Sequence, residues 1–88
     1  MKKSEQIFKS LEVLNLPVLS TMDELKSRYH TLAMQYHPDS GGDERKMAEL
    51  NAAYAVIKGY MKNFKFTFSE EEINKQFPED VYMDKFRF

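Results

Sequence analysis

The sequence predicts an all-α fold: an antiparallel helical hairpin, a short N-terminal helix packed on it, and a C-terminal extension made of an extended segment and a short helix. Two long runs of apolar residues at helical spacing, residues 22–36 and 43–62, form the predicted hairpin. A loop rich in helix-breaking residues, residues 37–42, separates them. A shorter periodic run at residues 4–14 precedes the hairpin and supplies the first helix.

Length and composition limit what the protein can be. With 88 residues, the chain is long enough for one small domain. It has no cysteine, which excludes disulfides, cysteine zinc sites and a thiol nucleophile and suits a reducing cytosol, so we expect a cytoplasmic protein. A net charge of −1 argues against nucleic-acid binding. Apolar runs are too short for a membrane span or a signal peptide, and we expect a monomer.

The first predicted helix covers residues 4–14. Its apolar positions follow the i, i+1, i+4, i+7 pattern of one helical face, and they are Ile7, Phe8, Leu11 and Leu14. Ser4 is the expected N-cap, and Asn15 is the expected left-handed residue that ends the helix. The connector at residues 16–19 contains Pro17 and is therefore expected to be extended.

The second predicted helix runs from Met22 to Tyr36. Thr21 and Glu24 have the spacing of a capping box at its start. The residues at core spacing are Leu25, Tyr29, Leu32, Ala33 and Tyr36, and those on the opposite face are Ser27, His30, Thr31 and Met34. Lys26 and Arg28 flank the core stripe. The outer face is interpreted either as a solvated surface or as a weakly basic docking surface.

The third predicted helix covers residues 43–62, with Asp43 as N-cap and Glu44 in the first turn. Its apolar residues recur at spacings of three and four, and they are Met47, Leu50, Tyr54, Ile57 and Met61. This narrow seam suits antiparallel packing against the second helix.

The loop between these helices is the best candidate site. Pro38 cannot continue a helix and keeps His37 out of the α region, so the second helix is expected to end at Tyr36. Gly41 and Gly42 allow positive φ and a tight reversal. The predicted result is a stiff, exposed turn at the hairpin tip that presents the imidazole of His37 and the carboxylate of Asp39.

The tail changes character after residue 62, so the chain is divided into residues 1–62 and an aromatic, acidic extension, residues 63–88. Residues 63–68 alternate phenylalanine with polar residues, which predicts an extended segment lying on the helices. A capping box at residues 69–72 begins a short helix carrying Ile73 and Phe77 that ends at Pro78, and a further turn through Val81, Tyr82 and Phe86 is expected.

The extension also differs from the rest of the chain in its net charge and in its content of aromatic side chains. Residues 1–68 carry ten basic and eight acidic residues and residues 69–88 three and six, which gives +2 and −3 and sums to −1. Burial of the aromatic side chains in the core is the first interpretation, because a small chain without tryptophan needs them there. The alternative is an aromatic and acidic surface for a partner protein.

The chain offers little chemistry of its own. No serine stands in a nucleophile turn, and there is no glycine-rich phosphate loop. His30, His37 and Asp39 lack a fourth partner at a recognised metal-ligand spacing. We therefore expect a helical binding module that is not an enzyme and that uses no cofactor or metal.

Three stretches of the sequence resemble one known family. Residues 24–39 read Glu-Leu-Lys-Ser-Arg-Tyr-His-Thr-Leu-Ala-Met-Gln-Tyr-His-Pro-Asp, residues 50–57 read Leu-Asn-Ala-Ala-Tyr-Ala-Val-Ile, and residues 11–16 read Leu-Glu-Val-Leu-Asn-Leu. Together they resemble the J domain of DnaJ-like co-chaperones, over about residues 7–61. Residues 41–44, with Lys46 and Met47, are also similar to the J domains of polyomavirus T antigens.

The resemblance implies a co-chaperone that binds the ATPase domain of a DnaK-type chaperone and stimulates its ATP hydrolysis, assisting protein folding. It implies that Asp39 pairs with an arginine of the chaperone and that His37 and Pro38 fix the loop and contact the partner. The implied docking face of the second helix consists of Lys26, Arg28, Tyr29 and His30.

Some positions depart from the family pattern. The family's second helix usually carries more positive charge where this chain has His30, Thr31 and Gln35, and a basic residue commonly stands where Ser40 does. We therefore expect weak electrostatic steering. The chain lacks the Gly/Phe-rich linker and the cysteine zinc module of full-length DnaJ. The alternative hypothesis is an adaptor that binds a client or second protein through residues 63–88 while its J-like domain is inactive.

Overall fold

The computed structural model describes residues 2–80 and confirms the all-α class. The elements are α1 (Lys3–Leu14), α2 (Met22–Tyr36), a 3-10 helix η1 (Pro38–Ser40), α3 (Glu44–Lys62) and α4 (Glu70–Gln76). Within residues 2–80 there is no β-strand. None of the helices in that range combines the length and the apolar character that crossing a bilayer requires.

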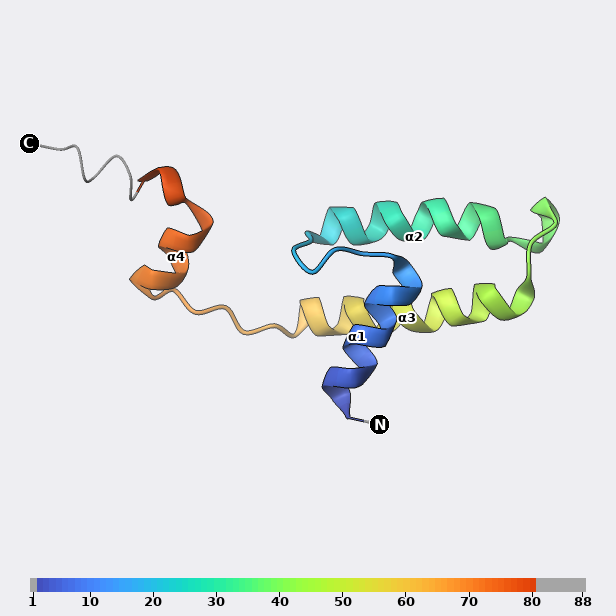
Figure 1. Ribbon diagram of the computed structural model, residues 1–88, viewed down its shortest axis with the longest axis horizontal. Coiled ribbons are helices and arrows are strands. Elements are labelled where there is room, and N and C mark those ends of the chain that lie inside the picture. Colours follow the sequence, from blue (N-terminus) through green and yellow to red (C-terminus); the bar gives the residue numbers. More distant parts are fainter. Residues whose placement is uncertain (1, 81–88) are drawn as a thin grey trace, which may run out of the picture.

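Helices α2 and α3 form the predicted antiparallel hairpin, and α1 crosses it (Figure 1). The core lies where these three helices meet. Its buried residues come from all three helices and from the connector after α1, and they are Leu14, Leu16, Leu25, Leu50, Ala53 and Ile57. Because these residues occupy the base of the hairpin, the far ends of α2 and α3 project beyond the core and carry the η1 loop at their tip (Figure 1).

The local signals at the helix ends are mostly confirmed. Thr21 and Glu24 form both hydrogen bonds of the capping box, and the Thr21 hydroxyl accepts the Glu24 N–H at 3.1 Å. Asn15 ends α1 with a φ of 50°, in the left-handed region. Ser4 as N-cap is wrong, because α1 begins at Lys3 and Lys2, two residues before Ser4, occupies the cap position without a side-chain hydrogen bond.

The burial pattern corrects two details of the predicted core. Phe8 is 62% exposed, because α1 turns Ile7, Leu11 and Leu14 toward the hairpin and leaves the edge of its apolar stripe in solvent. Tyr54 of α3 is only partly buried. Its ring stacks on that of Tyr29, with the two centroids 4.2 Å apart, between α2 and α3.

The C-terminal extension projects away from the three-helix unit (Figure 1). The expectation that its aromatic residues are buried in the core is wrong for Phe66 and Phe68, which are 72% and 83% exposed, whereas Phe64 packs edge-on against Tyr60 of α3. The short helix is confirmed as α4, with the Ser69 hydroxyl accepting the Glu72 N–H. The further turn predicted through Val81, Tyr82 and Phe86 lies outside the described residues.

Candidate functional site

The candidate site is the loop between α2 and α3, at the end of the hairpin opposite to α4 (Figure 1). Helix α2 ends at Tyr36, as the sequence predicts, and His37 has φ −63° and ψ 134°, in the extended region that a following proline enforces. Pro38 then opens η1. The proline thus separates the two helices and places the loop beyond the core.

A compact set of backbone hydrogen bonds fixes the loop. The His37 carbonyl oxygen accepts the N–H groups of Ser40 and Gly42, each at 3.0 Å, and the Pro38 carbonyl oxygen accepts the Gly41 N–H at 3.0 Å. The His37 imidazole Nδ1 accepts the Asp39 N–H at 3.2 Å. His37 therefore caps η1 with its side chain and closes the turn with its backbone, so the orientation of Asp39 is set locally.

The exposed carboxylate of Asp39 is the main chemical feature of the loop. Its side chain is 92% exposed, and its nearest charged or titratable neighbour in the described chain is His37, with Nδ1 and Oδ2 3.6 Å apart. Because Nδ1 accepts the Asp39 N–H, the hydrogen-bond pattern assigns the imidazole hydrogen to Nε2. The loop therefore presents a carboxylate and an imidazole to solvent on the same turn.

The two glycines of the loop serve different purposes. Gly41 has a φ of 78°, in the left-handed region, as predicted. Gly42 does not have a positive φ, but a Cβ on it would collide with the backbone carbon and oxygen of Tyr36. Gly42 is therefore needed because the chain leaving the loop passes directly against the end of α2.

We expect Gly42→Ala to lower the free energy of unfolding by about 1–3 kcal/mol, since either the loop or the end of α2 must move to relieve the collision. Chemical denaturation followed by circular dichroism measures this change. Gly59→Ala is the matched control: a Cβ there meets no atom within 4 Å, so it should be neutral or stabilise α3 by up to about 1 kcal/mol. Equal effects of the two substitutions would contradict the assigned role of Gly42.

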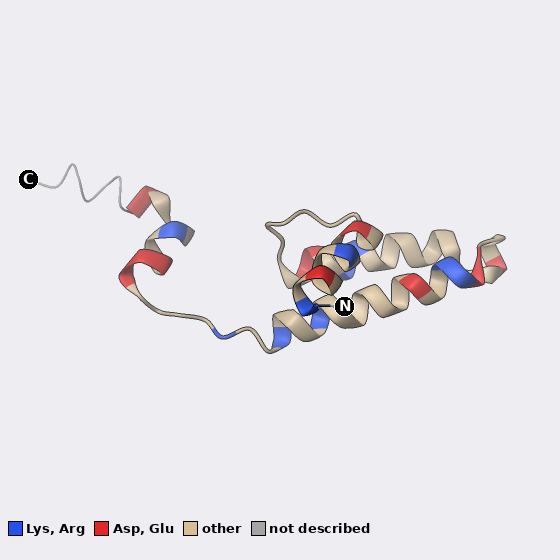
Figure 2. Cartoon of the chain, turned by 60° about the horizontal axis from the view of Figure 1, so that its bottom comes forward, with Lys and Arg blue, Asp and Glu red and all other residues tan. Residues whose placement is uncertain are grey.

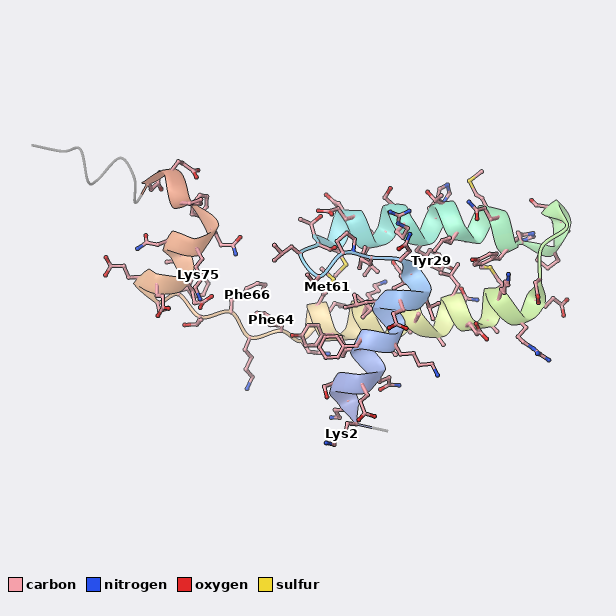
Figure 3. All side chains as sticks on the ribbon, in the orientation of Figure 1. Lys2, Tyr29, Met61, Phe64, Phe66 and Lys75 are labelled. Carbon is pink, nitrogen blue, oxygen red and sulfur yellow. The ribbon has the colours of Figure 1, made fainter. Side chains whose placement is uncertain are left out.

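The predicted docking residues of α2 do not all lie on its outer surface. Lys26 and His30 are exposed, and Arg28 is half-buried. Tyr29 turns toward α3, where its hydroxyl donates to the side-chain oxygen of Asn51 at 2.7 Å (Figure 3). The structure therefore brings His37, Pro38 and Asp39 together at the tip, with Lys26 and His30 free along α2, and assigns Tyr29 to the hairpin interior.

Helix α3 adds positive charge that the sequence analysis did not include. Asp43 caps α3 by accepting the Arg45 N–H at 2.8 Å, so Arg45 and Lys46 fall in its first turn, directly after the loop (Figure 2). The Lys46 ammonium lies 5.7 Å from the centre of the Tyr36 ring. The N-cap signal at Asp43 places both residues in that turn and could have identified them from sequence.

The site has the character of a docking surface. In residues 2–80 no three histidine, aspartate or glutamate side chains gather closely enough to hold a metal ion. The loop combines an exposed carboxylate, an imidazole that caps the turn, and nearby cations of α3 at the hairpin tip. Such a tip can bind a complementary charged surface on another protein.

Comparison with known proteins identifies the fold family. The family model of the DnaJ domain matches residues 9–66, which include the second half of α1, both hairpin helices and the loop. The chain belongs to the DnaJ domain family. The resemblance predicted from the sequence is thereby confirmed, and the His37-Pro38-Asp39 loop is the inter-helix loop of a J domain.

Individual relatives agree with this assignment. Small t antigen of Budgerigar fledgling disease virus is 55% identical over 40 residues, 46% of this chain and 28% of that protein. Chaperone protein dnaJ A6 of Oryza sativa subsp. japonica is 38% identical over 76 residues, 86% of this chain and 16% of that protein. Chaperone protein DnaJ of Methanosarcina acetivorans is 36% identical over 76 residues, 81% of this chain and 20% of that protein.

This J domain thus spans less than a third of the length of each of these three relatives. The predicted similarity to T antigens is confirmed by the first of them. No solved structure matches the chain significantly.

Proposed function

We propose that this J domain binds the ATPase domain of a DnaK-type chaperone and accelerates its ATP hydrolysis through the loop. The observation that carries the proposal is the state of Asp39: its carboxylate is almost fully exposed on a turn held by His37. Within residues 2–80, neither the core nor a helix cap uses this carboxylate. Membership of the DnaJ domain family and similarity to proteins named as DnaJ chaperones support the choice of partner.

The proposed contact divides the site residues by role. Asp39 accepts hydrogen bonds from an arginine of the chaperone, a charge-assisted pair that is stronger than a neutral one. His37 and Pro38 hold the turn and touch the partner beside it. Lys26, Arg28 and His30 contribute from α2, and we add Arg45 and Lys46 of α3. Tyr29 supports the hairpin from inside, since its hydroxyl is already bonded to Asn51.

In this proposal the chemistry belongs to the chaperone, and the J domain is not itself an enzyme. Stimulation requires that the J domain contact the hydrolysing state of the chaperone more favourably than the resting state. A small interface centred on one charged pair suits a transient complex whose association is guided by charge. The absence of cysteine from all 88 residues fits a reducing compartment, and we include a cytoplasmic location in the proposal.

A second candidate is an adaptor with an inactive J domain that recruits a client or other protein through the extension. The exposed side chains of Phe66 and Phe68 favour it, because large apolar groups at consecutive same-face positions commonly mark a binding surface. This candidate predicts no ATPase stimulation, whereas the lead proposal predicts stimulation.

Single-turnover ATP hydrolysis by the host's DnaK-type chaperones, with and without this protein, tests the proposal. We expect the hydrolysis rate of at least one of these chaperones to rise with J-domain concentration and to saturate. If no rate changes at any concentration while circular dichroism shows the folded helical protein, the lead proposal is wrong and the adaptor is favoured.

A further inference from the structure

An apolar groove of about 680 Å³ lies between the start of α1 and the end of α3. Its apolar walls come from Ile7, Val56, Tyr60 and Phe64, and the backbone of Gly59 also lines it. The Phe64 ring packs edge-on against Tyr60, with the centroids 5.7 Å apart, at the end of α3 (Figure 3). Lys3 and Lys65 also line the groove, so a complementary ligand is apolar and acidic.

Helix α4 has the properties that this groove requires. Helix α4 carries one apolar side chain within the helix, Ile73, and a second at its C-terminal end, the C-cap residue Phe77. These side chains are 43% and 51% exposed. The other residues of its first turn are acidic, Glu70, Glu71 and Glu72. An amphipathic helix with two apolar anchors is a recurring ligand of apolar grooves.

The segment before α4 leads it away from the groove of its own chain (Figure 1). Residues 64–68 read Phe-Lys-Phe-Thr-Phe, which favours extended backbone and contains neither glycine nor proline for a reversal. In two views α4 stands well away from α1 (Figures 1 and 2). The backbone groups of residues 65–68 form no backbone hydrogen bond with any other residue in the 2–80 range.

In place of the monomer expected from the sequence, we propose that two copies of this chain form a symmetric dimer in which residues 64–68 pair antiparallel and α4 of each copy occupies the groove of the other. Antiparallel pairing centred on Phe66 places Phe64 of one copy opposite Phe68 of the second. If the same register continues beyond the strands, Glu70 of one copy lies opposite Lys62 of the other, and Ile73 lies opposite Gly59 of the other. The two-fold axis repeats each contact, as in isologous dimers formed by exchanged elements.

Charge and shape both favour this register. The end of α3 and the residues after it carry Lys58, Lys62 and Lys65, whereas α4 begins with three glutamates (Figure 2). Antiparallel pairing brings each acidic turn next to the basic end of the partner helix, whereas parallel pairing would place like charges together. At Gly59 an added Cβ would meet nothing within 4 Å, so the groove is open where the register places Ile73.

The expected dimer is weak and depends on concentration. The interface would cover the exposed parts of five side chains and of the groove in each copy; the side chains are Phe64, Phe66, Phe68, Ile73 and Phe77. The total surface buried by the two copies is on the order of 1,000 Å², at the lower limit of stable interfaces. The pairing leaves the His37-Pro38-Asp39 loop free, because that loop lies at the opposite end of the hairpin (Figure 1). The dimer is therefore independent of the proposed co-chaperone function and can be tested separately.

Disulfide trapping tests the contact directly, because the natural chain has no cysteine. Gly59→Cys protein mixed with Ile73→Cys protein in a glutathione redox buffer is expected to accumulate a mixed disulfide-linked dimer. Ala48→Cys, at an exposed α3 position near the hairpin tip, replaces Gly59→Cys in the control mixture. A mixed dimer no more abundant than in the control overturns the proposal, and so does a Gly59→Cys, Ile73→Cys double variant that closes within single chains.

Sedimentation velocity over a concentration series provides the second test. Wild type is expected to shift from monomer to dimer as concentration rises, and Phe77→Asp is expected to weaken dimerisation about tenfold or more. Gly59→Leu fills the groove and should have the same effect, with Ala48→Leu as the control that dimerises normally. Circular dichroism confirms that each variant is folded. Wild type that stays monomeric throughout, or folded variants that dimerise as well as wild type, would overturn the proposal.

Discussion

The Asp39→Asn variant is expected to lose stimulation of the DnaK-type ATPase while its free energy of unfolding stays within about 0.5 kcal/mol of wild type. The substitution keeps the size of the side chain and removes its charge. Because the carboxylate is 92% exposed and makes no hydrogen bond within residues 2–80, its loss costs the J domain little. If the Asp39 carboxylate pairs with an arginine of the chaperone, Asp39→Asn removes the charge of that pair and leaves the arginine without its carboxylate in the complex.

Asp23→Asn is the matched control for this experiment. Asp23 is also an exposed aspartate of the hairpin, but it lies in the first turn of α2, at the end opposite to the loop. Its replacement weakens only a favourable interaction with the helix dipole, by about 0.3–1 kcal/mol. We expect normal stimulation from Asp23→Asn. Full activity of Asp39→Asn, or an equal loss in both variants, would contradict the role assigned to Asp39.

The His37→Gln variant separates orientation from charge. Exposure alone would predict a change in stability within about 0.5 kcal/mol for this substitution, but the structure shows the His37 Nδ1 accepting the Asp39 N–H. Loss of that bond from an exposed turn should cost about 0.5–1.5 kcal/mol and loosen the loop. Stimulation should fall even though Asp39 remains. This result would show that the carboxylate acts only when the turn holds it.

The features that sequence reasoning predicted well are those set by neighbouring residues. Helix α2 has the predicted bounds because the Thr21 and Glu24 capping box fixes its start and Pro38 ends it after Tyr36. The loop lies at the hairpin tip because the helices on either side of it are antiparallel. Such signals act over a few residues and depend little on tertiary packing.

The features that were predicted wrongly depend on which surfaces of the helices are covered by other parts of the same chain. Phe8 fits the apolar stripe of α1, but only three helices meet at the core and the stripe is wider than the surface that they offer. Phe66 and Phe68 were expected in the core on the argument that a small chain needs every aromatic residue. The buried leucines close the core without them, and the strand-like segment leads away from it.

Tyr29 is a residue to which the periodic pattern and the family resemblance assign different roles. Its position fits the core stripe of α2, whereas the resemblance to J domains places it on the docking face. The structure shows a packing role through two contacts that no local rule predicts, the stacking on Tyr54 and the hydrogen bond to Asn51, while contact of the partly exposed Tyr29 with a partner stays a prediction. Both residues lie more than 20 positions away in sequence, so only the pairing of α2 with α3 reveals them.

Leu50→Ala is expected to lower the free energy of unfolding by about 2–5 kcal/mol, the largest effect on stability among these predictions. Leu50 is fully buried at 0% exposure, in the middle of the cluster that α1, α2 and α3 share. Truncation removes apolar contacts and leaves a cavity that three rigid helices cannot close. Urea denaturation should show a lower midpoint with an unchanged slope.

The loss of stability is expected to decrease as the exposure of the substituted residue increases. Leu32→Ala and Tyr54→Ala, which the sequence analysis would place in the core, are expected to cost less than Leu50→Ala because both side chains retain solvent contact. Met34→Ala is the control: its side chain is 62% exposed, and its loss should change stability by no more than about 0.5 kcal/mol.

Since domains of this size have little stability to lose, Leu50→Ala should also reduce stimulation through unfolding, and stabilising osmolytes should restore it. Asp39→Asn should show no such recovery, because its fold is intact and the missing group belongs to the contact with the chaperone.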